Sequence, residues 1–343
     1  MSEMLFRLTA GTNVGCIRTN NEDNFIVNSN LKHKDWLLPG DASDEISLDE
    51  DGAVLVVADG MGGMNAGEVA SAIAVETIKE VFNRSSLEKI RTSAKKIEAF
   101  LKDAVTEADA NIKAKVKEDE STSGMGTTIV IAWVLGDVVH IVWCGDSRAY
   151  RFNHKSGLTR LSKDHSYVQE LVDAGKLDAE LAFDHPNSNI ITRSLGDSSA
   201  KARPDYTSCA LSEGDYILLC SDGLCGLCRD EETAHVMAGA DSIELCRTNL
   251  INAALEAGGY DNVTVALFEV VSLEGSKEEK IDITTNDIKK VKERKRRSRR
   301  SFWVFLLAAL VCVCVWLYYS GNLEPLMEAV KPMIEKITNL TNR

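Results

Sequence analysis

Two apolar runs joined by a two-residue turn constrain the fold of this chain more than any other feature. The runs TTIVIAWVL and VVHIVWC, at 127–135 and 138–144, are separated only by Gly136 and Asp137. A two-residue loop of this type joins neighbouring strands as a hairpin, so the two strands must be antiparallel. The same strand pattern recurs in four further runs, at 24–28, 53–58, 216–220 and 262–270.

Helical periodicity is confined to a few segments that lie between groups of strands. Apolar residues recur at helical spacing over 66–82, 87–117 and 241–257. Because the helices do not alternate one for one with the strands, a parallel sheet is not expected. The pattern favours an α+β fold in which two antiparallel β-sheets pack as a sandwich flanked by helices.

The charge is unevenly distributed along the chain. The formal net charge is −13, but the segment KKVKERKRRSRR at 289–300 is strongly basic. Residues 1–288 hold 27 Lys and Arg against 48 Asp and Glu. So acidic a body argues against nucleic acid as a partner.

The cysteines give no disulfide framework. There are nine, an odd number, and they are scattered along the chain. This usage favours a reducing compartment. The pair Cys225 and Cys228 has the spacing of half a zinc or redox site, but no second pair follows it, so we expect a structural role.

A run of eighteen uncharged residues from Phe302 to Tyr319 follows the basic segment directly. As a helix it would span about 27 Å, near the lower limit for crossing a bilayer, and aromatic residues lie at both of its ends. A buried core helix is the alternative, but such a helix is usually shorter and has polar breaks. The basic residues on its N-terminal side predict that 1–300 is cytoplasmic and that the tail is exported. We expect the basic segment either to bind anionic membrane lipids as well or to serve only as this topology signal. The expected organisation is a folded domain at 1–271, a polar then polybasic linker at 272–301, a single transmembrane helix at 302–319 and a short extracytoplasmic tail at 320–343.

Aspartates stand at the ends of several of the strand-like runs. An Asp-Gly step alone usually marks a turn. If these acids converge at one rim of the sandwich, however, they raise one another's pKa or require a cation. Oxygen-only ligands select Mg2+ or Mn2+ over zinc, and two such ions can hold a bridging hydroxide for in-line attack on a phosphoryl group. The residues in question are Asp23, Asp59, Asp146, Asp222 and Asp261.

The order of the short motifs favours a metal site over a set of unrelated turns. The series closely resembles the metal-dependent serine/threonine phosphatases of the PPM, or protein phosphatase 2C, family, and in detail its bacterial branch. The resemblance extends from about Leu5 to Val270. It implies a pair of β-sheets flanked by helices and hydrolysis of phosphoserine and phosphothreonine in proteins. The motifs are RTNNEDNF (18–25), VVADGMGG (56–63), GMGTTIV (124–130), CGDSRAY (144–150), LTRLSKDHS (158–166), ITRSLGD (191–197), LLCSDGL (218–224) and YDNVTV (260–265).

The resemblance also implies a binuclear Mn2+ or Mg2+ centre. By match to the family's motifs, Asp59 bridges both ions and the carbonyl of Gly60 binds one of them. Asp222 and Asp261 complete the other ion's site.

Four further residues receive roles by the same match. Glu22 and Asp23 contribute directly or through water, and Asp146 corresponds to the ligand of a weaker third ion. Arg18 matches the arginine that holds the substrate phosphate, a task that suits a planar fork of donors. No covalent nucleophile is implied.

The chain departs from many eukaryotic members at one position. Met61 stands where they carry a histidine that is a proposed general acid, so we assign no general acid, and we expect His165 to be structural. The segment 167–190, which includes Gly175 and His185, resembles the mobile flap of bacterial members that borders the substrate cleft. A covering helix and loop is the alternative for this segment.

Other functions remain to be weighed. No cysteine is followed six residues later by arginine, so the phosphate loop of cysteine-dependent phosphatases is absent from the sequence. A membrane-anchored, catalytically inactive phosphoprotein-binding scaffold is the remaining alternative. For the enzyme, we expect phosphorylated Ser/Thr proteins as substrates, opposite a cognate Ser/Thr kinase.

Overall fold

The computed structural model describes residues 3–36, 45–62 and 66–274. Contacts divide the chain into two units, Met1–Ser276 and Lys277–Arg343, and the described residues all belong to the first. The last strand runs to Glu274, three residues past the predicted domain boundary at 271. The predicted linker, transmembrane helix and tail therefore lie almost entirely outside the described residues. Within those residues no helix is both long and apolar enough to span a membrane.

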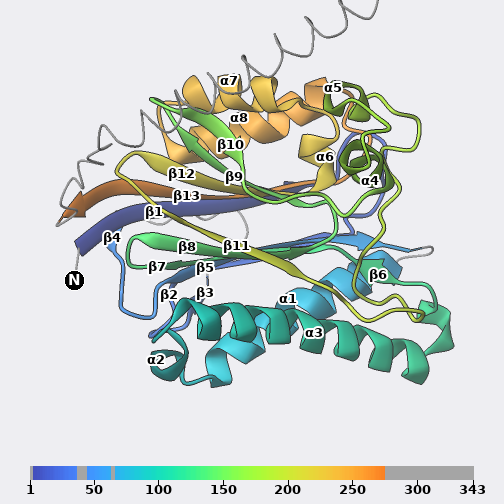
Figure 1. Cartoon of the computed structure of the whole chain (residues 1–343), viewed down its shortest axis with the longest axis horizontal. Helices are drawn as coiled ribbons and strands as arrows, with labels where there is room; N and C mark the ends of the chain where they lie inside the picture. Colours follow the sequence, from blue (N-terminus) through green and yellow to red (C-terminus); the bar gives the residue numbers. More distant parts are fainter. Residues whose placement is uncertain (1–2, 37–44, 63–65, 275–343) are drawn as a thin grey trace, which may run out of the picture. The chain divides into compact units, whose positions relative to one another are not determined.

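Two antiparallel sheets form the centre of the domain (Figure 1). In the described residues the first sheet has six strands, in the order β10-β9-β12-β13-β1-β4. Its strands are β1 (Glu3–Asn13), β4 (Ile46–Ser47), β9 (Arg148–Asn153), β10 (Gly157–Arg160), β12 (Asp215–Cys220) and β13 (Val263–Glu274).

The second sheet contains the predicted hairpin. Its strand order is β11-β8-β7-β5-β2-β3, with β6 paired to β5. Leu135 pairs with Val138 across the turn, and Gly136 has a positive φ of 56°, as a tight hairpin requires. The strands are β2 (Asp23–Asn30), β3 (Asp35–Trp36), β5 (Ala53–Met61), β6 (Gly126–Thr127), β7 (Ile129–Leu135), β8 (Val138–Cys144) and β11 (Asp205–Ala210).

Helices cover the outer faces of both sheets, which confirms the predicted sandwich of two sheets between helices (Figure 1). Over the second sheet lie α1 (Ala66–Arg84), α2 (Leu87–Ile90) and α3 (Ala94–Glu118), followed by a short 3-10 turn, η1 (Glu120–Thr122). Over the first sheet lie α7 (Asp230–Ala238) and α8 (Ile243–Glu256). Three short helices at one end of the sandwich are α4 (Tyr167–Asp173), α5 (Ala179–Ala182) and α6 (Asp222–Cys225).

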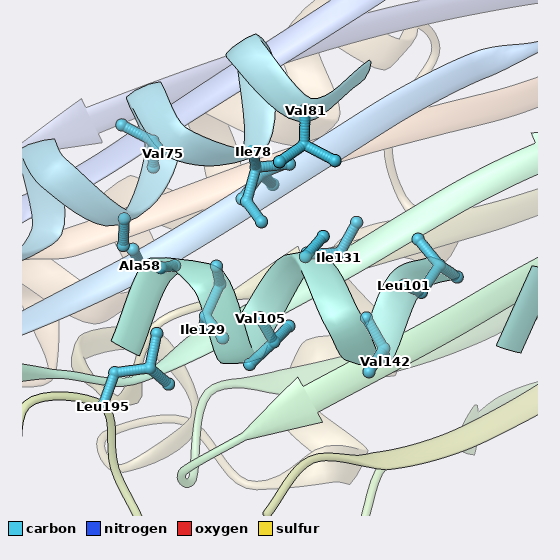
Figure 2. Close-up of a cluster of buried hydrophobic side chains, with 14 of the residues drawn as sticks. Ala58, Val75, Ile78, Val81, Leu101, Val105, Ile129, Ile131, Val142 and Leu195 are labelled. Carbon is cyan, nitrogen blue, oxygen red and sulfur yellow. The ribbon is translucent and has the colours of Figure 1, made fainter. Parts of the chain in front are cut away.

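Burial on both faces explains the unbroken apolar runs. In β5, Leu55 and Val57 point into the core between the sheets, whereas Val56 and Ala58 belong to the core beneath α1 and α3. Figure 2 shows the second of these cores, where Ile78 and other side chains of α1 lie above the strands. A strand that is covered on both sides needs apolar residues at every position, so β5 cannot alternate with polar residues.

Two features of the fold differ from the sequence prediction. The helix expected over 87–117 is divided, because Ser93 caps a new helix: its side chain accepts a hydrogen bond from the backbone N–H of Lys96. Strand β1 was not predicted, although it pairs with β13 along its whole length.

The pair Cys225 and Cys228 has the structural role expected of it. Both lie buried in the core beneath α6, α7 and α8, and all cysteines of the described residues are free thiols.

Candidate metal centre

Strand ends bring two of the predicted acids together in the second sheet. Asp23 is the first residue of β2, and Asp59 lies near the end of β5. The antiparallel register places these two residues directly opposite each other. Residues that face each other across antiparallel strands have Cβ atoms about 5 Å apart. The fold thus forces two carboxyl groups into one place.

The other acids come from turns at the ends of neighbouring strands. Asp222 begins α6, two residues after the end of β12, and Asp261 lies two residues before β13. Cys220, the last residue of β12, pairs with Val265, the third residue of β13. Asp146 occupies the turn between β8 and β9.

The acids act on one another electrostatically. Burial raises the pKa of Asp23 to about 8, with further contributions from Asp222 and Asp261. Burial also raises the pKa of Asp146 to about 8, and the charge of Asp222 adds to the shift. The pKa of Asp59 is raised well above its ordinary value by burial and then by the charge of Asp222. The predicted carboxylates therefore form a single cluster that extends across the edges of both sheets.

One oxygen of this cluster has no partner. Oδ1 of Asp222 is buried and accepts no hydrogen bond from any described group. A buried acceptor without a partner costs about 1–3 kcal/mol, which a cation at this oxygen would offset. An oxygen-rich, mutually repelling set of carboxyl groups around such an atom suits Mg2+ or Mn2+. The residues present therefore fit a hard divalent cation.

The cluster is not a closed cage in this structure. Among the described His, Cys, Asp and Glu side chains, no group of three or more has the arrangement of a finished metal site.

Two other predicted residues lie beside Asp261. Nη2 of Arg18 donates to Oδ2 of Asp261 at 2.7 Å, and both side chains are partly exposed. Glu22 is held through its backbone, because its N–H donates to Oδ1 of Asn262 at 2.7 Å. Burial raises the pKa of Glu22, and the nearby charge of Asp261 also raises it. Both residues thus belong to the same rim.

Several polar residues that hold the cluster in place were not predicted from the sequence. Asn262 ties the loop before β2 to Asp261, since its Nδ2 donates to the carbonyls of Val14 and Asn20. Ser221 donates to Oδ2 of Asp23 at 2.7 Å. Asn262 follows Asp261 in the motif YDN, and Ser221 precedes Asp222 in the motif CSD. A polar residue directly beside an acid was therefore the sequence signal that could have identified these two supporting residues.

A threonine pair fixes the backbone of Asp59. Oγ1 of Thr127 donates to the carbonyl of Asp59 at 2.8 Å, and the N–H of Asp59 donates to Oγ1 of Thr128. Thr128 also bonds to the hydroxyl of Ser147 at 2.6 Å, next to Asp146. The motif GTT therefore connects two of the acids.

The glycines after Asp59 have a packing reason. A Cβ on Gly60 would lie 2.2 Å from the carbonyl oxygen of Gly67 and 2.4 Å from that of Glu22. A side chain at Gly67 would meet the backbone of Gly60 at 2.8 Å. Glycine at both positions therefore lets the start of α1 pack against the strand ends that carry the acids.

His165 is placed as a structural residue. Its Nδ1 accepts the N–H of Gly145 at 3.1 Å, and its Nε2 pairs with Asp205 at 3.1 Å. Burial lowers its pKa, so the neutral ring is favoured. The ring supports the peptide next to Asp146.

A cavity of about 600 Å3 adjoins the cluster. Asp146, Asp222 and Asp261 line it, together with residues of the segment 167–190 that include parts of α4 and α5. The predicted flap residues do not line the cavity themselves. Gly175 turns the chain after α4 with a φ of 67°, and Nδ1 of His185 accepts the N–H of Asn187.

Comparison with known proteins identifies the family of this chain. The family model described as protein phosphatase 2C matches residues 37–257. The chain belongs to the protein phosphatase 2C family. The match leaves four of the site residues outside, namely Arg18, Glu22, Asp23 and Asp261.

Bacterial phosphatases are among the proteins to which the chain is similar. The serine/threonine phosphatase stp of Listeria welshimeri is 33% identical over 258 residues, which is 75% of this chain and 93% of that protein. The S. agalactiae serine/threonine phosphatase has a similar structure, with a TM-score of 0.65 and 30% identity over 77% of this chain and 99% of that one. The catalytic domain of the phosphatase PstP, solved in complex with two manganese ions, gives a TM-score of 0.62 and 30% identity over 78% and 100% of the two chains.

The raised carboxyl pKa values predict how the stability of this protein phosphatase 2C domain depends on pH. Between about pH 4 and pH 8, the folded state keeps protons on Asp23 and Asp146 that the unfolded state has released. The folded state then binds more protons, so stability in metal-free buffer falls as the pH rises through this window. Asp23→Asn removes one ionisation and should flatten the fall, as measured by thermal unfolding in EDTA.

Asp103→Asn is the matched control for this experiment, because Asp103 is exposed on α3. It should retain the wild-type dependence on pH. An Asp23→Asn protein whose midpoint falls as steeply as that of the wild type would contradict the assignment.

Proposed function

We infer that this chain is a metal-dependent protein phosphatase that hydrolyses phosphoserine and phosphothreonine with Mn2+ or Mg2+. The observation that carries the inference is the gathering of mutually repelling carboxyl groups around the unpaired oxygen of Asp222. The phosphatases to which the chain is similar, one of them solved with two manganese ions, support it.

The rim of the sandwich supplies the ligands for two ions. Asp59, the Gly60 carbonyl, Asp222 and Asp261 would hold them. When bound, divalent cations neutralise the carboxylates, polarise the phosphoryl group and lower the pKa of water. Glu22 and Asp23 would also contribute to holding these ions, directly or through water. Asp146 would hold a third, more weakly bound ion.

Arg18 orients the substrate in this proposal. Its ion pair with Asp261 keeps the guanidinium at the rim, where it remains partly exposed. A guanidinium presents several N–H donors in one plane, so it can bind phosphate oxygens while it still contacts the carboxylate.

No side chain near the acids is assigned as general acid. Met61 ends β5 beside them and carries no proton to donate. His165 is buried, and both of its ring nitrogens already have partners. Protonation of the leaving alcohol therefore falls to water or to a group other than Met61 and His165 in this mechanism.

Substitution of one acid tests the inference directly. Asp222→Asn keeps the size of the side chain but removes a charge that would hold the cation. Activity toward p-nitrophenyl phosphate in Mn2+ should fall about 100-fold or more, and EDTA should abolish wild-type activity. Asp103→Asn, on the surface of α3, is the control and should retain full activity.

The same assay separates the enzyme from the alternative scaffold. A wild-type chain that hydrolyses nothing with Mn2+ or Mg2+, yet still binds phosphopeptides, would favour the inactive phosphoprotein-binding scaffold.

We also propose that the apolar run at 302–319 anchors the chain in the cell membrane as a single span. The charge-free run and the nine basic residues of 289–300 support this proposal. The described domain would then lie in the cytoplasm, with the tail outside and the basic segment near anionic lipids. The full chain should sediment with membranes, whereas a chain that ends at Ser276 should not; recovery of both in the soluble fraction would refute the anchor.

Substrates are proposed from chemistry alone. A phosphatase held at the membrane should act on phosphorylated Ser/Thr proteins there, opposite a Ser/Thr kinase. Deletion of the gene should raise phosphoserine and phosphothreonine occupancy on membrane-associated proteins, as measured by quantitative phosphoproteomics. An unchanged phosphoproteome would reject this assignment.

A further inference from the structure

The cavity beside the acids is larger than phosphoryl chemistry needs. Its volume of about 600 Å3 lies in the range of pockets that enclose whole ligands. It is lined by residues of the flap segment, which we define as residues 167–190, and by residues of α6 and the start of α7. The cavity therefore has room for residues that flank a phosphorylated side chain.

The flap segment is attached firmly at its base. The N–H of Tyr167 donates to the carbonyl of Ile190 at 2.8 Å, and Ser166 and Ile191 form a β-bridge. Helix α4 is tied to the domain by an ion pair between Lys163 and Asp173 at 2.6 Å. Both ends of the segment are thus fixed next to each other.

The outer part of the flap segment, residues 175–189, has a single polar attachment to the domain. Within the described residues, the side-chain hydrogen bonds, ion pairs and ring contacts that join this part to residues outside the flap segment all come from Arg229. The backbone N–H groups of Gly175 and Lys176 bond only back to α4, at the carbonyls of Val172 and Leu171. The guanidinium carbon lies 4.2 Å from the ring centroid of Phe183, and Nη2 donates to Oδ2 of Asp184 at 2.5 Å. One planar cation thus contacts two adjacent residues of the flap segment.

Arg229 is well placed to act as a fixed point. It caps α7, and its backbone N–H donates to Oε2 of Glu232 at 2.8 Å, so its main chain is held independently of its side chain. Arg229 and Phe183 both line the cavity. The contact between them therefore joins the start of α7 to the flap segment at the cavity itself.

We propose that Arg229 clamps the flap segment against α7, and that this clamp positions the wall of the cavity that receives the polypeptide next to the phosphorylated residue. The proposal rests on the proposed phosphatase function. The cavity is present with the clamp formed, so the clamped arrangement is the one that binds peptide. A preformed wall lowers the ordering cost of binding, and its loss weakens binding of the peptide rather than the reaction at the acids.

Paired substrates test the clamp. In the full chain, Arg229→Ala should raise KM for a phosphothreonine peptide about fivefold, with little change in kcat. The loss of kcat/KM on the peptide should exceed the loss on p-nitrophenyl phosphate by the same factor, because that small substrate leaves the cavity wall unused. Phe183→Leu keeps an apolar side chain but removes the π face, and should change KM in the same direction. Arg229→Lys keeps the charge but loses the planar guanidinium, so its KM for the peptide should lie between those of the wild type and Arg229→Ala.

Hydrogen exchange gives a readout that does not depend on activity. Amides of 176–190 should exchange faster in Arg229→Ala and in Phe183→Leu than in the wild type. Arg84→Ala is the matched control, since Arg84 makes an exposed ion pair with Glu107 between α1 and α3. It should alter neither exchange in this segment nor the KM for the peptide.

Each outcome separates the clamp from the proposed function. Equal losses on both substrates, or unchanged exchange at 176–190 in both variants, would overturn the clamp. If Arg229→Ala does not fold, Phe183→Leu decides in its place. A wild-type chain inactive on both substrates would defeat the phosphatase inference, while the exchange rates would still test the clamp.

Discussion

Carboxyl groups held together away from water repel one another, and the rest of this structure serves to hold them there. Asp59 is fixed by its strand and by hydrogen bonds with two threonines, and Asp23 by its register opposite Asp59 and by a hydrogen bond from Ser221. Two sheets with both faces buried give these strand ends little freedom to move apart. The strain of like charges is then available to favour a bound cation.

Much of the fold follows from local patterns, and the exceptions have physical reasons. The hairpin was evident because Gly136 permits the tight turn between two apolar runs. Strand β1 was not evident: its partner, β13, lies some 250 residues away, and nothing local in the sequence identifies that pairing. The break at Ser93 depends on one capping hydrogen bond, which helical periodicity alone does not reveal.

The acids of the site could be predicted from the sequence, whereas the polar residues that hold them in place could not. Each acid interrupts the end of an apolar run, so it stands out in the sequence. Asn262 and Ser221 act through partners that only the folded chain supplies, namely the carbonyl of Val14 and the carboxylate of Asp23. The clamp at Arg229 is hidden in the same way, because an exposed arginine at a helix start resembles many others.

Pairing of β1 with β13 has a consequence for synthesis of the protein. Strand β1, the first described strand of the domain in chain order, occupies the interior of its sheet, between β13 and β4, and its main neighbour is the last strand of the domain. A nascent chain that stops before Val263 therefore leaves both β1 and β12 with unpaired backbone groups along one side. Such edges recruit other chains, so the domain is most prone to aggregate just before its translation ends.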